Sequence, residues 1–326
     1  MTLRPASAAE CGLDDTPLAV IDLETTGLPG SGEILEVAIV RVEPGAPPRI
    51  VLDTLVRPVG PVKGTRIHGI LDDEVLDAPP LQDVLPHVQA ALSDCVVAAY
   101  NAGFDIGMLR AAGEAHAWPA LTALPHVCLM WLRQHLKIGR RQPLDDACAQ
   151  HRITLSQYHA AASDAHAAAL LWNTYRPALA DAGVRRFGDL ARVAPTSRYV
   201  ASLTAPLPRS PSSPPAAPLL PRVPRLGRLD HVEARSRYAR LLAVFAADGR
   251  ISPSEANALV HFAQHVGGAE RFLAELHADL VAALGRGEIV DRRLTTSELK
   301  DLAAMLGGVE RGETWARFDG EWTIWS

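Results

Sequence analysis

A chain of 326 residues is longer than most single domains, so its length predicts two of them. A composition of 48% hydrophobic and 21% charged residues excludes a chain that is disordered throughout. The net charge of -5 also excludes a protein that holds nucleic acid through a uniformly basic surface.

The four cysteines form neither a zinc-binding nor a disulfide pattern, because none of them belongs to a C-x-x-C pair. This usage indicates a reducing compartment. The N-terminus lacks the apolar core of a signal peptide, and no stretch reaches the ~18 uncharged apolar residues of a membrane span. We therefore expect a cytoplasmic protein with no membrane partner.

The N-terminal half alternates between strand and helix patterns. Short apolar runs predict strands over 17–23, 34–42, 50–56 and 95–100. Amphipathic or alanine-rich segments predict helices over 81–92, 105–115, 128–136, 144–151 and 163–175. This order predicts an α/β fold in which helices flank a mixed sheet.

Two carboxylates end the first strand. Asp22 and Glu24 are two residues apart, so they point to the same face as Leu18 and Val20. Like charges on so apolar a strand are costly unless a cation neutralises them, which favours a divalent metal. The alternative is that the strand leaves the core at Asp22 and the acids are solvated.

Two later motifs supply further polar groups. The segment Asn101–Asp105 places an acid at the start of a helix that follows an apolar strand, where an aspartate is also a common cap. His159 precedes Asp164 by five residues, and the alanine-rich helix is expected to turn Asp164 inward. Taken alone, a histidine near a helix start is typical of the surface.

Together the motifs D-x-E-T-T-G, N-x-G-F-D and H-x-x-x-x-D resemble the DnaQ-like 3′–5′ exonucleases of the DEDDh class. The resemblance covers about residues 16–176 and includes the Ile67–Ile70 segment (IHGI), Val75, Ala78–Pro79, Cys128 and Leu144. It implies an RNase H-like fold. Leu129, where many members have threonine, departs from the family pattern outside the catalytic set.

The resemblance also implies roles for individual residues. Two divalent cations, Mg2+ or Mn2+, would be held by Asp22, Glu24, Asp105 and Asp164, with His159 as the general base. The candidates for contact with the terminal nucleotide are Thr25, Thr26, Gly27, His68, Asn101 and Phe104. The alternative for His68 is a loop histidine, and for Phe104 a core aromatic.

A proline- and arginine-rich stretch follows. Residues 195–224 contain nine prolines, which exclude a helix or a central strand, so we expect an extended linker over 185–225. Residues 185–240 contain eleven arginines and three acids, a local net charge of +8 that leaves -13 for the rest of the chain. The arginines either keep a linker soluble or form an arm along a phosphate backbone.

The C-terminal part, 226–326, has helical periodicity over 232–246, 254–266, 269–284 and 297–306. An Asp-Gly turn between aromatic segments predicts a hairpin over 315–325. Two similar segments each contain paired acids, which suit capping boxes or a second metal or partner site: Asp248, Glu255, Asp291 and Glu298. The first segment, ADGRIS-x-x-E, resembles TerB-like helical domains.

These observations predict an exonuclease domain over 1–184, a basic linker over 185–225 and a smaller, mostly α-helical domain over 226–326. The expected activity is two-metal hydrolysis from the 3′ end of single-stranded DNA, in repair or replication. Two alternatives stay open. One is a 3′–5′ exoribonuclease in RNA processing, and the other is a proofreading or scaffold subunit that docks a polymerase or repair complex through its C-terminal domain.

Overall fold

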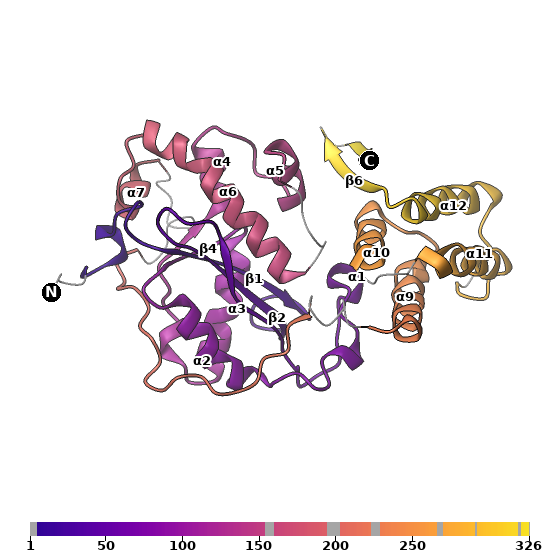
Figure 1. Cartoon of the computed structure of the whole chain (residues 1–326), viewed down its shortest axis with the longest axis horizontal. Coiled ribbons are helices and arrows are strands. Elements are labelled where there is room, and N and C mark those ends of the chain that lie inside the picture. The colour runs from indigo at the N-terminus through magenta and orange to yellow at the C-terminus, as the bar shows by residue number, and fades with distance from the viewer. Residues whose placement is uncertain are drawn as a thin grey trace. The chain divides into compact units, whose positions relative to one another are not determined.

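The computed structural model describes residues 5–153, 160–193, 203–222, 229–265, 270–290, 292–318 and 321–325 (Figure 1). The chain forms two compact units. The sheet unit comprises the described residues of 1–63, 72–155 and 161–221. The helical unit comprises those of 64–71, 156–160 and 222–326.

The sheet unit is built on five strands in the order β3-β2-β1-β4-β5. They are β1 (Leu18–Thr25), β2 (Ile34–Val42), β3 (Arg49–Leu55), β4 (Val96–Ala99) and β5 (His126–Cys128). The first three pair antiparallel, whereas β4 pairs parallel to β1 and β5 parallel to β4. This mixed sheet confirms the predicted RNase H-like fold.

Alternate residues of β1 enter two different cores. Leu18 and Val20 pack toward α6 (Ala161–Asp181), which lies across β1 and β2. Ala19 and Ile21 pack on the other face, against α2 (Leu81–Leu92) and α3 (Ala102–Ala115). Both faces of the sheet are therefore covered by helices, as the apolar strands predicted.

The remaining short elements of the sheet unit are η1 (Ala8–Glu10), η2 (Asp72–Glu74), η3 (Pro119–Leu121), α4 (Leu129–His135), α5 (Leu144–Gln150), η4 (Phe187–Asp189) and α7 (Leu190–Val193). The sequence predicted a helix from 128, but a three-residue strand precedes it. The strand β5 escaped prediction because it is too short to show an alternating pattern.

The proline-rich segment is part of the sheet unit where it is described. Leu203 and Leu207 are buried in the core beneath α6. The Asp94 amide donates to the Pro208 carbonyl at 2.9 Å, and the Leu55 amide donates to the Leu220 carbonyl at 2.9 Å. Residues 203–221 contain neither helix nor strand. The sheet unit includes them up to 221, whereas the exonuclease domain predicted from the sequence ends at 184, because leucines between the prolines supply apolar anchors.

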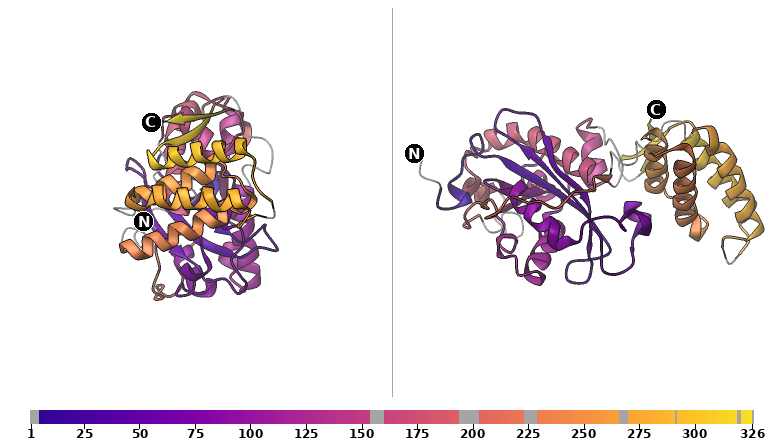
Figure 2. Two further views of the ribbon diagram at one scale, coloured as in Figure 1. Left: turned by 90° about the vertical axis from the view of Figure 1, so that its right-hand side faces the viewer. Right: turned by 60° about the horizontal axis from the view of Figure 1, so that its bottom comes forward.

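The helical unit confirms the predicted α-helical C-terminal region. It contains α1 (Thr65–His68), α9 (His231–Phe245), η5 (Ala246–Asp248), α10 (Pro253–His265), α11 (Glu270–Arg286), α12 (Thr296–Glu310), β6 (Thr314–Phe318) and β7 (Glu321–Trp325). The four long helices stack side by side, as Figure 2 shows. The strands β6 and β7 pair antiparallel, which confirms the hairpin, although its turn at 319–320 lies outside the described residues.

Cys11, Cys95, Cys128 and Cys148 all lie in described ranges, are buried, and form no disulfide. None of the helices in the described ranges combines the length and apolarity that crossing a bilayer requires.

Candidate active site

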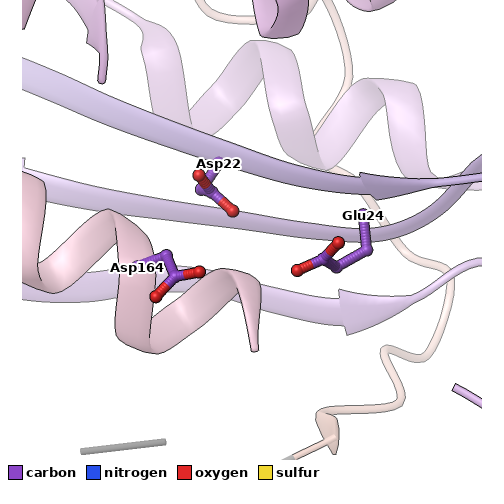
Figure 3. A group of neighbouring side chains, drawn as sticks. All are labelled: Asp22, Glu24 and Asp164. Carbon is purple, nitrogen blue, oxygen red and sulfur yellow. The ribbon is translucent and has the colours of Figure 1, made fainter. Parts of the chain in front are cut away.

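Three carboxylates meet where the end of β1 faces the first turn of α6 (Figure 3). One oxygen from each of Asp22, Glu24 and Asp164 lies within 4.8 Å of the other two. Asp22 and Asp164 are half-buried, and Glu24 is only 8% exposed. The burial of Glu24 excludes the alternative in which the strand simply leaves the core at this point.

The local sequence explains this convergence. Asp22 and Glu24 continue the row of Leu18 and Val20, which faces α6. The first turns of α6 are rich in buried alanines, whose small side chains let the helix lie close to the strand and bring Asp164 beside it. The predicted inward orientation of Asp164 is confirmed.

Asp105 lies beside this trio. Its side chain is 4% exposed, and its Oδ1 accepts a hydrogen bond from the Leu23 amide at 3.1 Å. Leu23 sits between Asp22 and Glu24, so this bond ties the first turn of α3 to the strand that carries two of the acids. Asp105 is therefore not a helix cap, and the N-cap of α3 is Asn101.

The negative charges of the acids repel one another, and burial increases the cost of ionising them. Burial raises the pKa of Asp22 well above its ordinary value, and the charges of Asp105, Asp164, Glu24 and Glu36 raise it further. Burial likewise raises the pKa of Asp105 to about 7, against the lowering effect of backbone hydrogen bonds. Desolvated, mutually repelling carboxylate oxygens are the donor set that a hard divalent cation stabilises. The residues present therefore fit Mg2+ or Mn2+.

Glu36 is a component of this cluster that the motif analysis missed. It is fully buried in β2, directly opposite Glu24 in the strand register. Its Oε2 accepts a hydrogen bond from the Ala161 amide at 3.4 Å, at the start of the helix that carries Asp164. An acid inside the apolar run ILEVAIV is the same signal that singled out Asp22, and it could have identified Glu36.

The loop after β1 is held by its own hydrogen bonds. The Thr25 hydroxyl donates to the Gly27 carbonyl at 2.8 Å, and the Thr26 amide and hydroxyl bond to the backbone of Glu33 at 2.9 and 2.8 Å. Gly32 lies so close to Gly27 that an added Cβ would meet its carbonyl carbon at 2.4 Å. The three predicted nucleotide contacts therefore stand in a preformed turn, and their role stays a prediction.

The other predicted substrate contacts differ in burial and belong to both units. Asn101 is exposed, whereas Phe104 is half-buried against the core formed by α2 and α3. His68 is 1% exposed and belongs to the helical unit, where its Nδ1 accepts a hydrogen bond from the Ile70 amide at 3.0 Å. His159, the predicted general base, lies outside the described residues.

The acids of the first C-terminal motif bind an arginine. Glu255 forms the predicted capping box with Ser252, donating its amide to the Ser252 hydroxyl and accepting from the Ser252 amide. Its Oε1 lies 2.8 Å from Nη2 of Arg66, which also lies 3.1 Å from Oδ2 of Asp248. The partner of these acids is thus a side chain of the same unit.

The second motif repeats this arrangement locally. Thr295 and Glu298 form a capping box, and Glu298 pairs with Arg292 at 2.6 Å. Asp291 lies outside the described residues. Guanidinium groups therefore pair with Asp248, Glu255 and Glu298, three of the four acids proposed for a second metal or partner site.

Comparison with known proteins agrees with the geometry. Residues 19–172 match the RNase T family model, which is described as an exonuclease. The DNA polymerase III PolC-type protein of Streptococcus pneumoniae is 30% identical over 163 residues, which are 48% of this chain and 11% of that protein. A Mycobacterium tuberculosis protein, whose name proposes a bifunctional exonuclease/endonuclease, is 32% identical over 205 residues, 58% of this chain and 31% of that protein.

Among solved structures, this chain is similar to Exonuclease X in complex with 5′-overhanging duplex DNA. The match covers 58% of this chain and 99% of that chain, at 25% identity and a TM-score of 0.38. The chain spans only about a tenth to a third of the length of the two curated relatives described above. Residues 19–172 are accordingly similar to a family of exonucleases.

Proposed function

We propose that this protein is a metal-dependent 3′–5′ exonuclease that hydrolyses phosphodiester bonds at the 3′ ends of single-stranded DNA. The observation that carries the proposal is the convergence of Asp22, Glu24 and Asp164 within 4.8 Å beside the buried Asp105, inside a segment that matches an exonuclease family. The 3′–5′ polarity rests on the resemblance to DnaQ-like enzymes.

The four acids would hold two divalent cations. When bound, Mg2+ or Mn2+ supplies positive charge to the scissile phosphate and lowers the pKa of the attacking water. His159 would accept the proton of that water, because the pKa of a histidine lies near neutral pH. The preformed turn at Thr25, Thr26 and Gly27 would bind the terminal nucleotide without reordering.

The names of the relatives favour DNA as substrate, because several are DNA polymerase III PolC-type proteins. A role in replication or repair follows from that substrate. Recognition of RNA would require contacts with the 2′ hydroxyl group. Digestion of matched DNA and RNA strands therefore decides between the exodeoxyribonuclease and the exoribonuclease.

Polarity is tested with one oligonucleotide labelled at either end, incubated with the full chain and Mn2+. A 3′–5′ exonuclease shortens the 5′-labelled strand through a ladder and releases mononucleotides from the 3′-labelled strand from the first turnover. Mononucleotide release from the 5′ label, or internal fragments from a circular strand, would overturn the proposal.

A polymerase-associated proofreading role is the second candidate, and the PolC-type relatives favour it. Such a subunit would increase the fidelity of a replicative polymerase with which it co-purifies. Processive polymerisation with unchanged error rate in the presence and absence of this chain would remove that candidate and leave the free exonuclease.

A further inference from the structure

A basic loop joins α4 to α5 in the sheet unit. Residues 136–143 contain Lys137, Arg140 and Arg141, and no acid lies anywhere in 129–143. All three side chains are exposed, and within the described ranges none of them forms an ion pair or a side-chain hydrogen bond. The loop therefore presents concentrated, uncompensated positive charge to the solvent.

Two buried side chains hold this loop in shape. The Tyr100 hydroxyl donates to the Gln142 carbonyl at 2.7 Å. Arg133 is fully buried, and an added Cβ at Gly139 would lie 2.5 Å from its Cζ. Nη2 of Arg133 donates to Oε1 of Gln150 at 2.6 Å, while its Nε and Nη1 have no partner among the described residues. The core thus fixes the loop, and the charge of Arg133 adds to its positive potential.

The loop also returns over the first turn of α4, where Arg141 stacks on Trp131. Cζ of Arg141 lies 4.4 Å from the centre of the ring. Trp131 is half-buried against the core that also holds Cys128, whereas Arg141 is exposed. A stacked guanidinium keeps its N–H donors in its own plane, where they can bind phosphate, and a nucleobase can stack on that plane. The pair thus offers both modes by which proteins bind single-stranded nucleic acid.

The two helices that carry the loop lie beside the carboxylate cluster. Both pack against α6 on the same side of the sheet (Figure 1). Burial raises the pKa of the Cys128 thiol at the start of α4, and the charge of Asp105 raises it further. Burial also raises the pKa of Cys148 in α5 to about 12, and the charge of Asp164 adds to this. Because such charge effects weaken with distance, an acid of the cluster lies near each of the two helices.

We propose that residues 129–143 bind the substrate strand on the 5′ side of its terminal nucleotide. One base would stack on Arg141, and neighbouring phosphates would be bound by Lys137, Arg140 and Arg141. The inference rests on the proposed function, in which the 3′ end lies at the carboxylates. The ligand is a single strand, because a base must leave the duplex stack before it can lie on a guanidinium.

This surface also explains how a chain of net charge -5 holds a polyanion. The carboxylates repel phosphates until metal is bound, whereas the loop attracts them without metal. Binding is therefore measured with the full chain in chelator, from the fluorescence anisotropy of a 5′-labelled oligothymidine of about twelve nucleotides. Hydrolysis then contributes nothing to the signal.

Arg141→Gln should weaken this binding about tenfold, since it removes both a stacking plane and a charge. The slope of log affinity against log salt should fall by about 0.7 in Arg141→Gln, and by about 2 when Lys137 and Arg140 are also changed to Gln. Arg141→Lys keeps the charge, so it should retain the wild-type salt slope and lose most of the stacking contribution.

Arg49→Gln is the matched control. Arg49 is an exposed arginine of the same unit and lies opposite Arg41, which in turn lies opposite Ala19 at the start of β1. It therefore stands at the edge of the sheet away from the acids, which end β1. Its affinity and salt slope, corrected for nothing else, should match wild type, and all variants should melt within about 2 °C of wild type because the changed side chains are exposed.

Turnover with Mn2+ separates this inference from the proposed function. Arg141→Gln should raise KM for the same strand about tenfold and leave kcat within about twofold. An active wild type whose affinity and salt slope are unchanged in the triple variant overturns this inference alone. An inactive wild type that loses affinity in Arg141→Gln overturns the proposed function and leaves a surface that binds single strands. Displacement of the strand by polyglutamate at equal charge concentration would overturn the inference by assigning the loop to an acidic protein.

Discussion

At the scale of single residues, the site shows acids placed where they reduce stability. Asp105 is buried, its pKa is raised to about 7, and it faces the charge of Asp22. A carboxylate kept for packing alone would be paired with a cation or exposed to water. The arrangement is therefore explained by chemistry that needs the negative charge.

The metal-free protein should lose stability as pH rises. The folded-state pKa of Asp105, about 7, lies above the unfolded value of about 3.9, so this group contributes stability below pH ~4 that is lost progressively as pH rises through about 7. Asp105→Asn keeps an oxygen for the Leu23 amide and removes the charge. With a chelator present at pH 8, the melting temperature of Asp105→Asn should be at least about 3 °C above that of wild type.

The same comparison at pH 5 gives the control, because the wild-type carboxyl group is then protonated in the folded state and the advantage of the variant should shrink. Mn2+ at pH 8 should raise the melting temperature of wild type more than that of the variant. A metal-free variant that melts below wild type at pH 8 would contradict the electrostatic account.

Glu36 is predicted to support the cluster without being one of the three grouped acids. Its hydrogen bond to the Ala161 amide fixes the start of α6, three residues before Asp164. Outer-shell partners of metal ligands typically contribute 10–100-fold in affinity, so Glu36→Ala should weaken Mn2+ binding by about tenfold or more. Glu36→Gln, which keeps the acceptor, should lose less. Equal Mn2+ affinity of Glu36→Ala and wild type in calorimetric titration would exclude this role.

The four acids could be predicted because each stands in a short motif at the end of an apolar element. Glu36 belongs to none of those motifs. Its place in an apolar run could have identified it as a buried acid, but its bond with the Ala161 amide of α6, 125 residues away in sequence, could not be predicted. The location of His68 was also beyond prediction. Its carbonyl is bound by Arg222, a contact that no local pattern encodes.

At the scale of elements, the turn between β1 and β2 is shaped by close backbone approach. Gly32 stands against the backbone of Gly27, where a Cβ would meet the carbonyl carbon at 2.4 Å. The turn carries Thr25 and Thr26 directly after the acids of β1. In the proposed function, its shape determines where a terminal nucleotide meets the cluster.

Gly32→Ala should distort this turn and raise KM by about tenfold or more, because small displacements at a binding loop are costly to catalysis. Mn2+ affinity should stay near that of wild type, since the acids precede the turn. Ser31→Ala is the control, as the Ser31 hydroxyl makes an exposed hydrogen bond to the Leu28 carbonyl, to which the Ser31 amide also donates. Wild-type KM in Gly32→Ala would show that the turn does not contact substrate.

Helices with a clear apolar periodicity were predicted with nearly correct bounds, whereas the shortest strand was not predicted. The helix predicted over 81–92 coincides with α2, because its apolar spacing and length are both clear. β5 has three residues, and its place in the sheet is fixed by parallel pairing with β4. Such a strand depends on tertiary contacts more than on its own sequence.

At the scale of the whole molecule, the sheet unit extends past the last motif of the exonuclease family. Phe187 is fully buried and stacks on Trp172 of α6, with ring centroids 6.2 Å apart and planes 6° from parallel. Leu203 and Leu207 belong to the same core. A boundary at 184 would remove all three of these later side chains from the core.

Phe187→Ala should therefore lower the free energy of unfolding of the sheet unit by about 3–5 kcal/mol, the usual effect of emptying a buried aromatic site. Leu76→Ala, a change at a residue that is 63% exposed, is the control and should shift stability by less than about 0.5 kcal/mol. Urea unfolding measures both. A Phe187→Ala midpoint equal to that of the control would restore the boundary at 184.

The arginines of the basic stretch fall into two groups in the folded chain, one buried and one exposed. The basic stretch around the prolines contains Arg222 and Arg237, which are buried and bind the turn at 64–71. Arg185, Arg192 and Arg209 of the same stretch are exposed and can still meet a phosphate backbone. The basic stretch could be predicted from the composition. Which of its arginines are buried against backbone carbonyls and which are exposed to solvent could be learned only from the fold.

Asp22 and its neighbouring acids are proposed to form the catalytic metal site of an exonuclease. The most direct measurement compares wild type and Asp22→Asn on a 5′-labelled single strand with Mn2+, together with the melting temperature of each. Metal binding supplies several kcal/mol to the transition state, so the variant should be slower by about a thousandfold or more. It should remain folded and melt, without metal, no lower than wild type. Undiminished shortening by the folded variant would contradict the account.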